Sequence, residues 1–232
     1  MNTIGILGNI GSGKNTVAQY LATKGCVPTS FAGPIKDLCT SVFGWDRELL
    51  EGETDESREF REGIDLYWSK KLSIPDFTPR LALQLIGTDV MRNHFNQDIW
   101  LNSLEYRVKK LHNQNECVVI SDCRFKNELE LIRRVGGTTI LVQRDDKPEW
   151  YDIALAANNG DAVAKHIMSK DFANIHLSEY EWIGSDIDFT INNNGTLEDL
   201  YANVDIVIAV SYTHLRAHET LMNLVCRLLL EK

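Results

Sequence analysis

Short apolar runs alternate with stretches of helical periodicity along this chain. The apolar runs predict short strands, which cover 3–7, 26–32, 117–121, 138–144 and 189–193. The helical patterns repeat apolar residues every three to four positions, and they cover 15–24, 33–44, 80–95, 97–112, 126–135 and 196–209. Because strands and helices alternate, we expect an α/β fold with a doubly wound, mainly parallel sheet of four to five strands.

Two polar segments interrupt this alternation. Residues 46–79 are charged, weakly periodic and closed by two prolines, which predicts an irregular insertion or mobile flap with one or two short helices on the substrate side. Residues 145–175 form a polar helical region that is interrupted at Asn158-Asn159-Gly160 and suits a lid. We expect both segments to belong to one domain that covers residues 1–209.

The most informative motif joins the first predicted strand to the first predicted helix. Its glycines allow backbone angles and close approaches that a Cβ would block, and the helix N-terminus and the lysine then face an anion. Such a loop predicts binding of a nucleotide triphosphate; a glycine-rich turn that merely begins a helix is the alternative. The predicted binding residues are Gly8, Gly11, Ser12, Gly13, Lys14, Asn15 and Thr16.

This motif departs from the pattern G-x-x-x-x-G-K-[ST] at its last position. Asn15 stands where a serine or threonine would place its hydroxyl on Mg²⁺, and Thr16 follows. Either the side-chain carbonyl oxygen of Asn15 takes that place, directly or through water, or Thr16 contributes. We expect Mg²⁺ near these two residues and Asp122.

Asp122 and Arg124 follow the third predicted strand. Ligands of open α/β sheets bind beyond the carboxyl ends of the strands, so Asp122 is expected beside the glycine loop. There its carboxylate can hold Mg²⁺ through water or act on an acceptor, and Arg124 can pair with a phosphate. The alternative is an aspartate that caps the next helix, with an arginine on the rim. Lys14, Asp122 and Arg124 are the predicted catalytic residues.

Other polar residues lie in the segments between the loop and the third strand. Lys36 lies in the first turn of the helix at 33–44, and Arg58 lies in the charged insertion. Both are candidates to meet a substrate. By its local pattern alone Lys36 is better explained as a surface residue of an amphipathic helix, and a solvated charged face explains Arg58 equally well. Gly87-Thr88 interrupts the helix at 80–95 and would bring its backbone close to a ligand.

Composition narrows the class of protein but does not choose a substrate. The 232 residues have a formal net charge of -9, which argues against broad binding to a nucleic-acid backbone. The five cysteines form no C-x-x-C pair, and we expect reduced thiols. We expect neither a signal peptide nor a membrane span, and hence a cytoplasmic protein. The segment 210–232 is similar to translated sequencing-adapter DNA; we expect it to be non-native and give it no functional weight.

The motifs together resemble the bacteriophage deoxynucleoside monophosphate kinases, a P-loop fold of the nucleoside monophosphate kinase type. The resemblance runs from Ile4 to about Val204, and its most specific parts are FAGPIKD at 31–37 and TPRLALQLIGTDVMRNHFNQDIW at 78–100. It also includes the glycine loop, VVISDCRFKNE at 118–128, HLSE at 176–179 and NNNGTLEDL at 192–200.

This resemblance implies transfer of the γ-phosphoryl group of ATP, with Mg²⁺, to a deoxynucleoside monophosphate for phage DNA precursor synthesis. For a phage-encoded protein the location would be the host cytoplasm. A homodimer and the accepted bases stay open. By matching position, the resemblance implies that the following residues surround the monophosphate: Lys36, Arg58, Arg80, Gly87, Thr88, Trp100, Asp122, Arg124 and Glu128.

Two other classes compete with this hypothesis. Another small-molecule P-loop kinase, of the dephospho-coenzyme A or phosphomevalonate kinase type, would share the loop and Asp122 but differ in its acceptor pocket. A nucleotide-dependent switch would be expected to carry a guanine-specificity motif such as N-K-x-D, which we do not find.

Overall fold

The computed structural model describes residues 3–52 and 54–211 of the chain. The chain forms two compact units, which we name the sheet unit (Met1–Thr29 with Glu105–Lys232) and the helical unit (Ser30–Leu104). Most of the segment that was predicted to be non-native, from residue 212 onward, lies outside the described residues.

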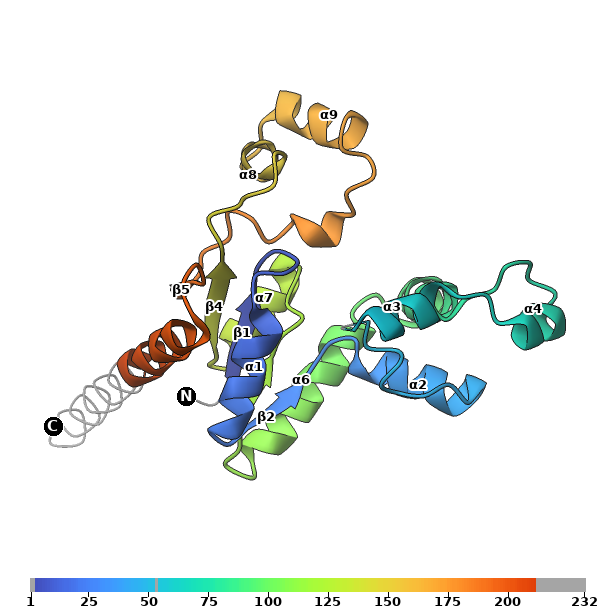
Figure 1. Ribbon diagram of the computed structural model, residues 1–232, viewed down its shortest axis with the longest axis horizontal. Helices are drawn as coiled ribbons and strands as arrows, with labels where there is room; N and C mark the ends of the chain where they lie inside the picture. Colours follow the sequence, from blue (N-terminus) through green and yellow to red (C-terminus); the bar gives the residue numbers. More distant parts are fainter. Residues whose placement is uncertain (1–2, 53, 212–232) are drawn as a thin grey trace, which may run out of the picture. The chain divides into compact units, whose positions relative to one another are not determined.

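The sheet unit contains a five-stranded sheet in the order β2-β3-β1-β4-β5, with every pair parallel. Figure 1 shows these strands beside the helices of the unit. The predicted doubly wound sheet is confirmed; β1 has the predicted bounds, and the other four strands end one to three residues earlier than predicted. The strands are β1 (Thr3–Leu7), β2 (Cys26–Thr29), β3 (Cys117–Ile120), β4 (Thr138–Gln143) and β5 (Phe189–Asn192).

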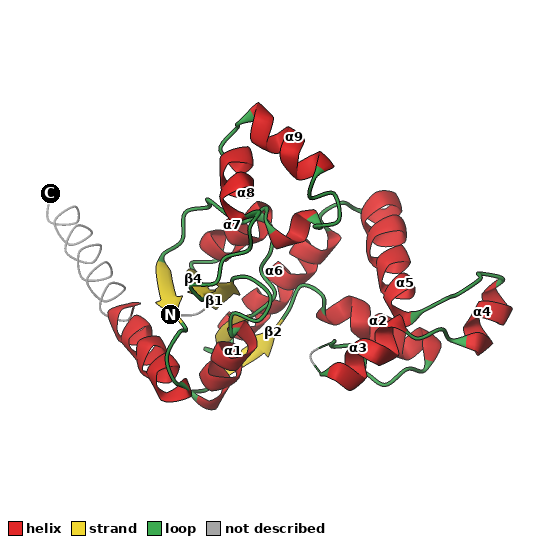
Figure 2. Ribbon diagram, turned by 45° about the horizontal axis from the view of Figure 1, so that its top comes forward, coloured by secondary structure: helices red, strands yellow, loops and turns green. Residues whose placement is uncertain are grey.

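Helices cover both faces of this sheet (Figure 2). Ile4 and Ile6 of β1 pack in one core cluster with α1 (Lys14–Thr23) and with the helix at 197–211. On the other face Gly5 meets α7 (Lys126–Arg134), where an added Cβ would lie 2.9 Å from Ile132 Cγ1. That face also receives the last turns of α6 (Ile99–His112), because His112 Nε2 bonds to Thr3 Oγ1 at 2.8 Å. Alternate side chains of β1 thus serve the two faces.

The predicted reduced state of the thiols is wrong for one pair of cysteines. Cys26 and Cys117 lie opposite each other in β2 and β3 and form a disulfide. Cys39 and Cys123 are buried free thiols. Because the two strands are 91 residues apart in the sequence, spacing alone did not reveal that these two cysteines are neighbours in the sheet.

The polar region at 145–175 folds as two short helices, α8 (Tyr151–Asn158) and α9 (Ala162–Lys170). The break between them falls at the predicted asparagine–glycine turn. The side chain of Asn158 donates to Tyr180 O at 2.7 Å and to Ile183 O at 2.9 Å. These bonds tie α8 to the segment that leads through the short helix η2 (Leu177–Glu179) toward β5.

The helical unit packs around aromatic side chains. Of the one or two short helices predicted within 46–79, two are present, α3 (Asp55–Glu62) and α4 (Leu66–Leu72). Leu50 and Phe77 of this charged segment are buried together with Trp45. Asp65 helps to hold the indole of Trp45 in the aromatic core, because its Oδ2 accepts from Trp45 Nε1 at 2.8 Å. The helices are α2 (Gly33–Phe43), α3 (Asp55–Glu62), α4 (Leu66–Leu72), α5 (Pro79–Gln84) and η1 (Leu85–Phe95).

The predicted α-helix at 80–95 continues as a π-helix, η1, from Leu85 onward. Gly87 lies in it against α2, and a Cβ at this position would come within 2.2 Å of Ile35 Cδ1. A wider helix that brings its backbone against a neighbour needs a residue without a side chain.

Within 3–52 and 54–211, no helix is both long and apolar enough to cross a membrane.

Candidate functional site

The glycine loop after β1 has the backbone that its sequence predicts. Gly8, Gly11 and Gly13 have φ angles of 144°, 76° and 103°, a region that side chains disfavour. A Cβ on Gly8 would lie 2.1 Å from the backbone oxygen of Val142 in β4. Glycine is therefore required here for both conformation and space.

Lys14 begins α1 and turns its side chain back over the loop. Its Nζ donates to Gly8 O and Asn9 O, at 2.7 Å in both cases. The pKa of Lys14 is lowered to about 8, mainly by burial and also by the nearby Arg124, while Glu179 opposes the shift. An anion bound here would offset the cost of keeping this ammonium group charged away from water.

Two polar atoms of the same loop have no hydrogen-bond partner among the described residues. Asn9 Oδ1 and Ser12 Oγ are both buried from solvent. Buried hydroxyl groups normally donate or accept at least one bond. The Ser12 hydroxyl beside a lysine and a helix N-terminus fits an anion such as a phosphate oxygen.

Asp122 and Arg124 follow β3, at the carboxyl end of the strand beside β1. Helix α7 begins after Phe125, and Glu128 caps its first turn. Glu128 Oε2 accepts from Arg124 N at 2.7 Å and from Phe125 N at 3.1 Å. Glu128 thus has a backbone-holding role that its predicted substrate contact did not include.

The side chain of Arg124 is held by the segment that follows α9. Its Nη1 donates to Glu179 Oε1 and, at 3.4 Å, to Ser178 Oγ. Glu179 also influences the charge of Lys14. The structure thus brings Lys14, Arg124 and Glu179 into one electrostatic cluster. The segment HLSE at 176–179 is part of the resemblance to the kinase family, but no role was predicted for Glu179. A single carboxylate outside a recognised motif does not indicate a function in the sequence.

In the helical unit the structure joins two of the predicted substrate residues. Trp100 Nε1 donates to the backbone oxygen of Gly87 at 2.9 Å, in a buried contact. Thr88 is exposed beside it in η1. The π-helical backbone and the indole are therefore one structural feature.

The three predicted cations of this unit all have carboxylate partners. Lys36 pairs with Glu51, which also pairs with Arg47. Arg58 Nη1 lies 2.9 Å from Asp55 Oδ1, and Arg80 Nη1 lies 2.6 Å from Glu62 Oε1. A phosphate that binds any of these cations would therefore have to share it with a carboxylate or replace that carboxylate.

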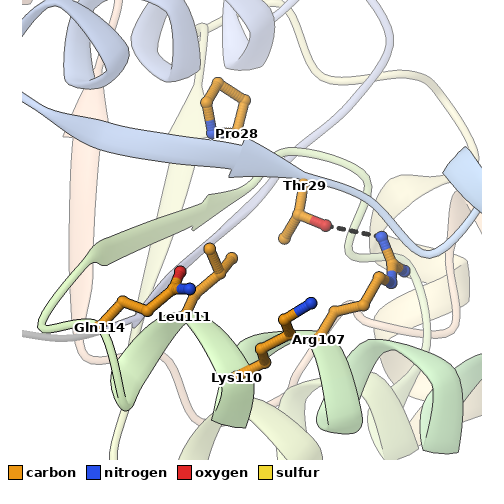
Figure 3. Close-up of a pocket in the computed structure, with 6 residues that line it drawn as sticks. All are labelled: Pro28, Thr29, Arg107, Lys110, Leu111 and Gln114. Atoms are coloured by element: carbon orange, nitrogen blue, oxygen red, sulfur yellow. Dashed lines mark hydrogen bonds between the residues drawn. The ribbon is translucent and has the colours of Figure 1, made fainter.

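A separate pocket of the sheet unit was not predicted. It has a volume of about 310 Å³ and lies where β2 ends against α6 (Figure 3). Arg107 crosses it and donates to Thr29 Oγ1 at 2.8 Å. Its lining residues are Pro28, Thr29, Arg107, Lys110, Leu111 and Gln114.

Comparison with known proteins identifies similar kinases. A family described as "Deoxynucleotide monophosphate kinase" matches residues 60–160. A protein of Acanthamoeba polyphaga mimivirus, provisionally named as a deoxynucleotide monophosphate kinase, is 32% identical over 88% of this chain and 94% of its own length. The deoxynucleoside-5'-monophosphate kinase of Escherichia phage T5 is 28% identical over 57% of this chain and 72% of its own length.

Solved structures give a weaker likeness. Dephospho-CoA kinase from Campylobacter jejuni is 16% identical and aligns over 90% of this chain and 96% of its own, with a TM-score of 0.44. Shikimate kinase from Aquifex aeolicus is 12% identical and aligns over 92% of this chain and 98% of its own, with a TM-score of 0.40. At these values the likeness carries no argument about substrate.

Proposed function

Because this chain belongs to the deoxynucleotide monophosphate kinase family, we propose that it transfers the γ-phosphoryl group of ATP to deoxynucleoside 5'-monophosphates. The products are the deoxynucleoside diphosphate and ADP. The observation that carries the proposal is the partly buried Lys14 inside the glycine loop, within electrostatic reach of Arg124. Such cations suit the charge that spreads over a phosphoryl group during transfer.

In the sheet unit, the glycine loop with Lys14, Arg124 and Asp122 each have a role in this reaction. The loop N–H groups and Lys14 hold the phosphates of ATP, and Arg124 neutralises charge on the transferred or accepting phosphate. An acceptor phosphate is already ionised near neutral pH, since its second pKa is about 6. Its oxygen can attack phosphorus without a general base, so Asp122 would act on orientation and metal binding.

The donor set of the loop also fits Mg²⁺, the cofactor that such a transfer implies. Asn15, Thr16 and Asp122 offer amide, hydroxyl and carboxylate oxygens, the ligands that Mg²⁺ prefers. When bound, the metal ion would neutralise phosphate charge. Asn15 is exposed at the start of α1, where an amide oxygen can take the place of the usual hydroxyl.

The helical unit carries predicted acceptor residues of its own. Gly87, Thr88 and Trp100 form a backbone-and-indole feature suited to a base or sugar, and Lys36, Arg58 and Arg80 are cations suited to its phosphate. No observation favours a coenzyme A or mevalonate acceptor over a nucleotide. Consistent with the family, the physiological role we propose is supply of DNA precursors in the cytoplasm.

A coupled ADP-release assay tests the substrate. Turnover is expected with one or more of dAMP, dCMP, dGMP, dTMP and hydroxymethylated dCMP, in the presence of ATP and Mg²⁺. Turnover of dephospho-coenzyme A or phosphomevalonate, with none of the five nucleotides accepted, would contradict the proposal.

Lys14→Ala tests the loop. Removing a preorganised charge at the transferred group is expected to lower kcat by at least about 100-fold. Lys24→Ala is the matched control, because Lys24 follows the other end of α1 and pairs with Asp205 at 3.2 Å. Equal activities of the two variants would refute the phosphate-binding role of the loop.

A further inference from the structure

The turn after β5 reaches the glycine loop through one buried side chain. Asn193 is 8% exposed, and its Nδ2 donates to the backbone oxygen of Ser12 at 2.8 Å. Because a carbonyl oxygen can only accept, the NH₂ group and not Oδ1 must face Ser12. Both residues belong to the sheet unit.

This bond fixes the direction of one peptide group in the loop. In a trans peptide the C=O of one residue and the N–H of the next point in opposite directions, and the described residues contain no cis bond. Holding the Ser12 carbonyl toward Asn193 therefore aims the Gly13 N–H the other way. Gly13 is the N-cap of α1, where backbone N–H groups can bind anions.

Asn193 is itself held by the end of the sheet. Its backbone N–H donates to Gln143 O at 2.8 Å, and the next residue, Asn194, accepts at Oδ1 from Asp145 N at 3.0 Å. A Cβ on Gly13 would lie 2.4 Å from Asn193 Nδ2, so the contact also requires glycine at position 13. The amide thus reaches the loop from an anchored position.

We infer that Asn193 is a positioning residue for phosphoryl transfer, which presets the Ser12–Gly13 peptide so that the Gly13 N–H faces the phosphates of ATP. This inference rests on the proposed kinase function. A donor that is already aimed needs no reorganisation when the phosphate arrives. Asn193 therefore governs the affinity for the triphosphate although it acts through the loop.

The test compares Asn193→Asp and Asn193→Ala with the wild-type chain. The aspartate keeps the shape but presents an acceptor oxygen to the Ser12 carbonyl, and the alanine removes the donor. Calorimetry with ATP and with inorganic tripolyphosphate should show affinities about tenfold or more below wild type, since a misplaced group can cost about 100-fold. The KM for the deoxynucleoside monophosphate should stay within about twofold.

Asn194→Asp is the matched control. It introduces the same charge one residue away, at an exposed position, and keeps an oxygen that can accept from Asp145 N. It should bind both probes as the wild type does, and thermal unfolding without ligand checks that all variants are folded. If folded Asn193 variants bind as tightly as Asn194→Asp, this inference is refuted while the kinase function stands; a wild-type chain that binds neither probe refutes both.

A measurement on the wild type covers the case in which the Asn193 variants do not fold. The backbone amide resonance of Gly13 in ¹⁵N-labelled protein should shift on addition of tripolyphosphate, because its N–H is expected to meet the anion. An unchanged Gly13 resonance under saturating tripolyphosphate would overturn the inference.

Discussion

At the scale of single residues, the candidate site contains one arginine, Arg124, for which Glu179 and a bound phosphate would compete. This side chain is 43% exposed and pairs with Glu179, the carboxylate that also acts on Lys14. A phosphate that approaches must take Arg124 from this partner or share it. Partly exposed ion pairs contribute up to about 1 kcal/mol, so the competition is modest in size.

Glu179→Gln should therefore strengthen anion binding. We expect the affinity for tripolyphosphate to rise by up to about fivefold at low salt, the equivalent of about 1 kcal/mol. The gain should shrink at about 0.5 M salt, because salt screens the interaction between the charges. Calorimetry at two salt concentrations measures the effect.

Glu181→Gln removes the same charge two residues further along the chain and serves as the control. A gain of equal size in both variants would show that net charge, and not the pairing with Arg124, is responsible.

At the scale of elements, the π-helix η1 is the feature that most distinguishes the helical unit. Its Gly87 is pressed against Ile35 of α2, and its carbonyl is satisfied by the Trp100 indole. π-Helical segments are frequent at functional sites. The hydrogen bond links the position of Trp100 to the shape of the element that carries Thr88.

Trp100→Phe tests what this hydrogen bond contributes to stability and to the reaction of the acceptor. Loss of the indole N–H leaves the Gly87 carbonyl without this donor and should cost about 1 kcal/mol of the free energy of unfolding. We also expect kcat/KM for the deoxynucleoside monophosphate to fall by about tenfold, the equivalent of about 1.4 kcal/mol, with ATP affinity unchanged.

Trp68→Phe is the control for stability, because Trp68 Nε1 donates to Phe43 O at 3.1 Å in the same unit. It should lose stability without the kinetic effect. Identical kinetics in the two variants would remove Trp100 from the acceptor site.

At the scale of the whole molecule, each unit has its own core and its own charge network. In the helical unit Glu51 joins Lys36 and Arg47. Burial raises the pKa of Glu51, but the hydrogen bonds and charges of Lys36 and Arg47 outweigh it, and the net pKa is lowered. A lowered carboxyl pKa stabilises the folded state above the unfolded value of about 4.3 and loses that contribution as the pH falls through the folded pKa.

The free energy of unfolding of the helical unit should therefore decline as the pH falls below about 4.5. Glu51→Gln should lower it by about 1 kcal/mol at pH 7, an amount limited by solvent screening of this partly exposed pair, and should flatten the acid-dependent decline. Urea titrations at pH 7 and at pH 3.5, followed by tryptophan fluorescence, measure both effects. Glu48→Gln, an exposed carboxylate in the same segment, should behave as wild type; an unchanged decline in Glu51→Gln would contradict the assignment.

Much of the fold followed from local pattern. The predicted strands and most helices are present because continuous apolar runs can be buried in a parallel sheet and amphipathic helices can cover it. The π-helix was not predicted; the close approach of Gly87 to Ile35 that accompanies it joins two elements and leaves no local pattern. The aromatic core to which 46–79 contributes was not predicted, because charged residues dominate the sequence of that segment.

The sequence by itself determined the order of strands and helices, the glycine loop with Lys14, and the Asp122–Arg124 pair at the end of β3, because each depends on neighbours in the chain. Tertiary structure decided which distant groups meet them: Glu179 on Arg124, Asn193 on the Ser12 carbonyl, and Cys26 against Cys117. Sheet order and the return of the chain after β5 bring these partners together. Hydrogen bonds and ion pairs act over a few ångströms in space, whatever the distance along the chain.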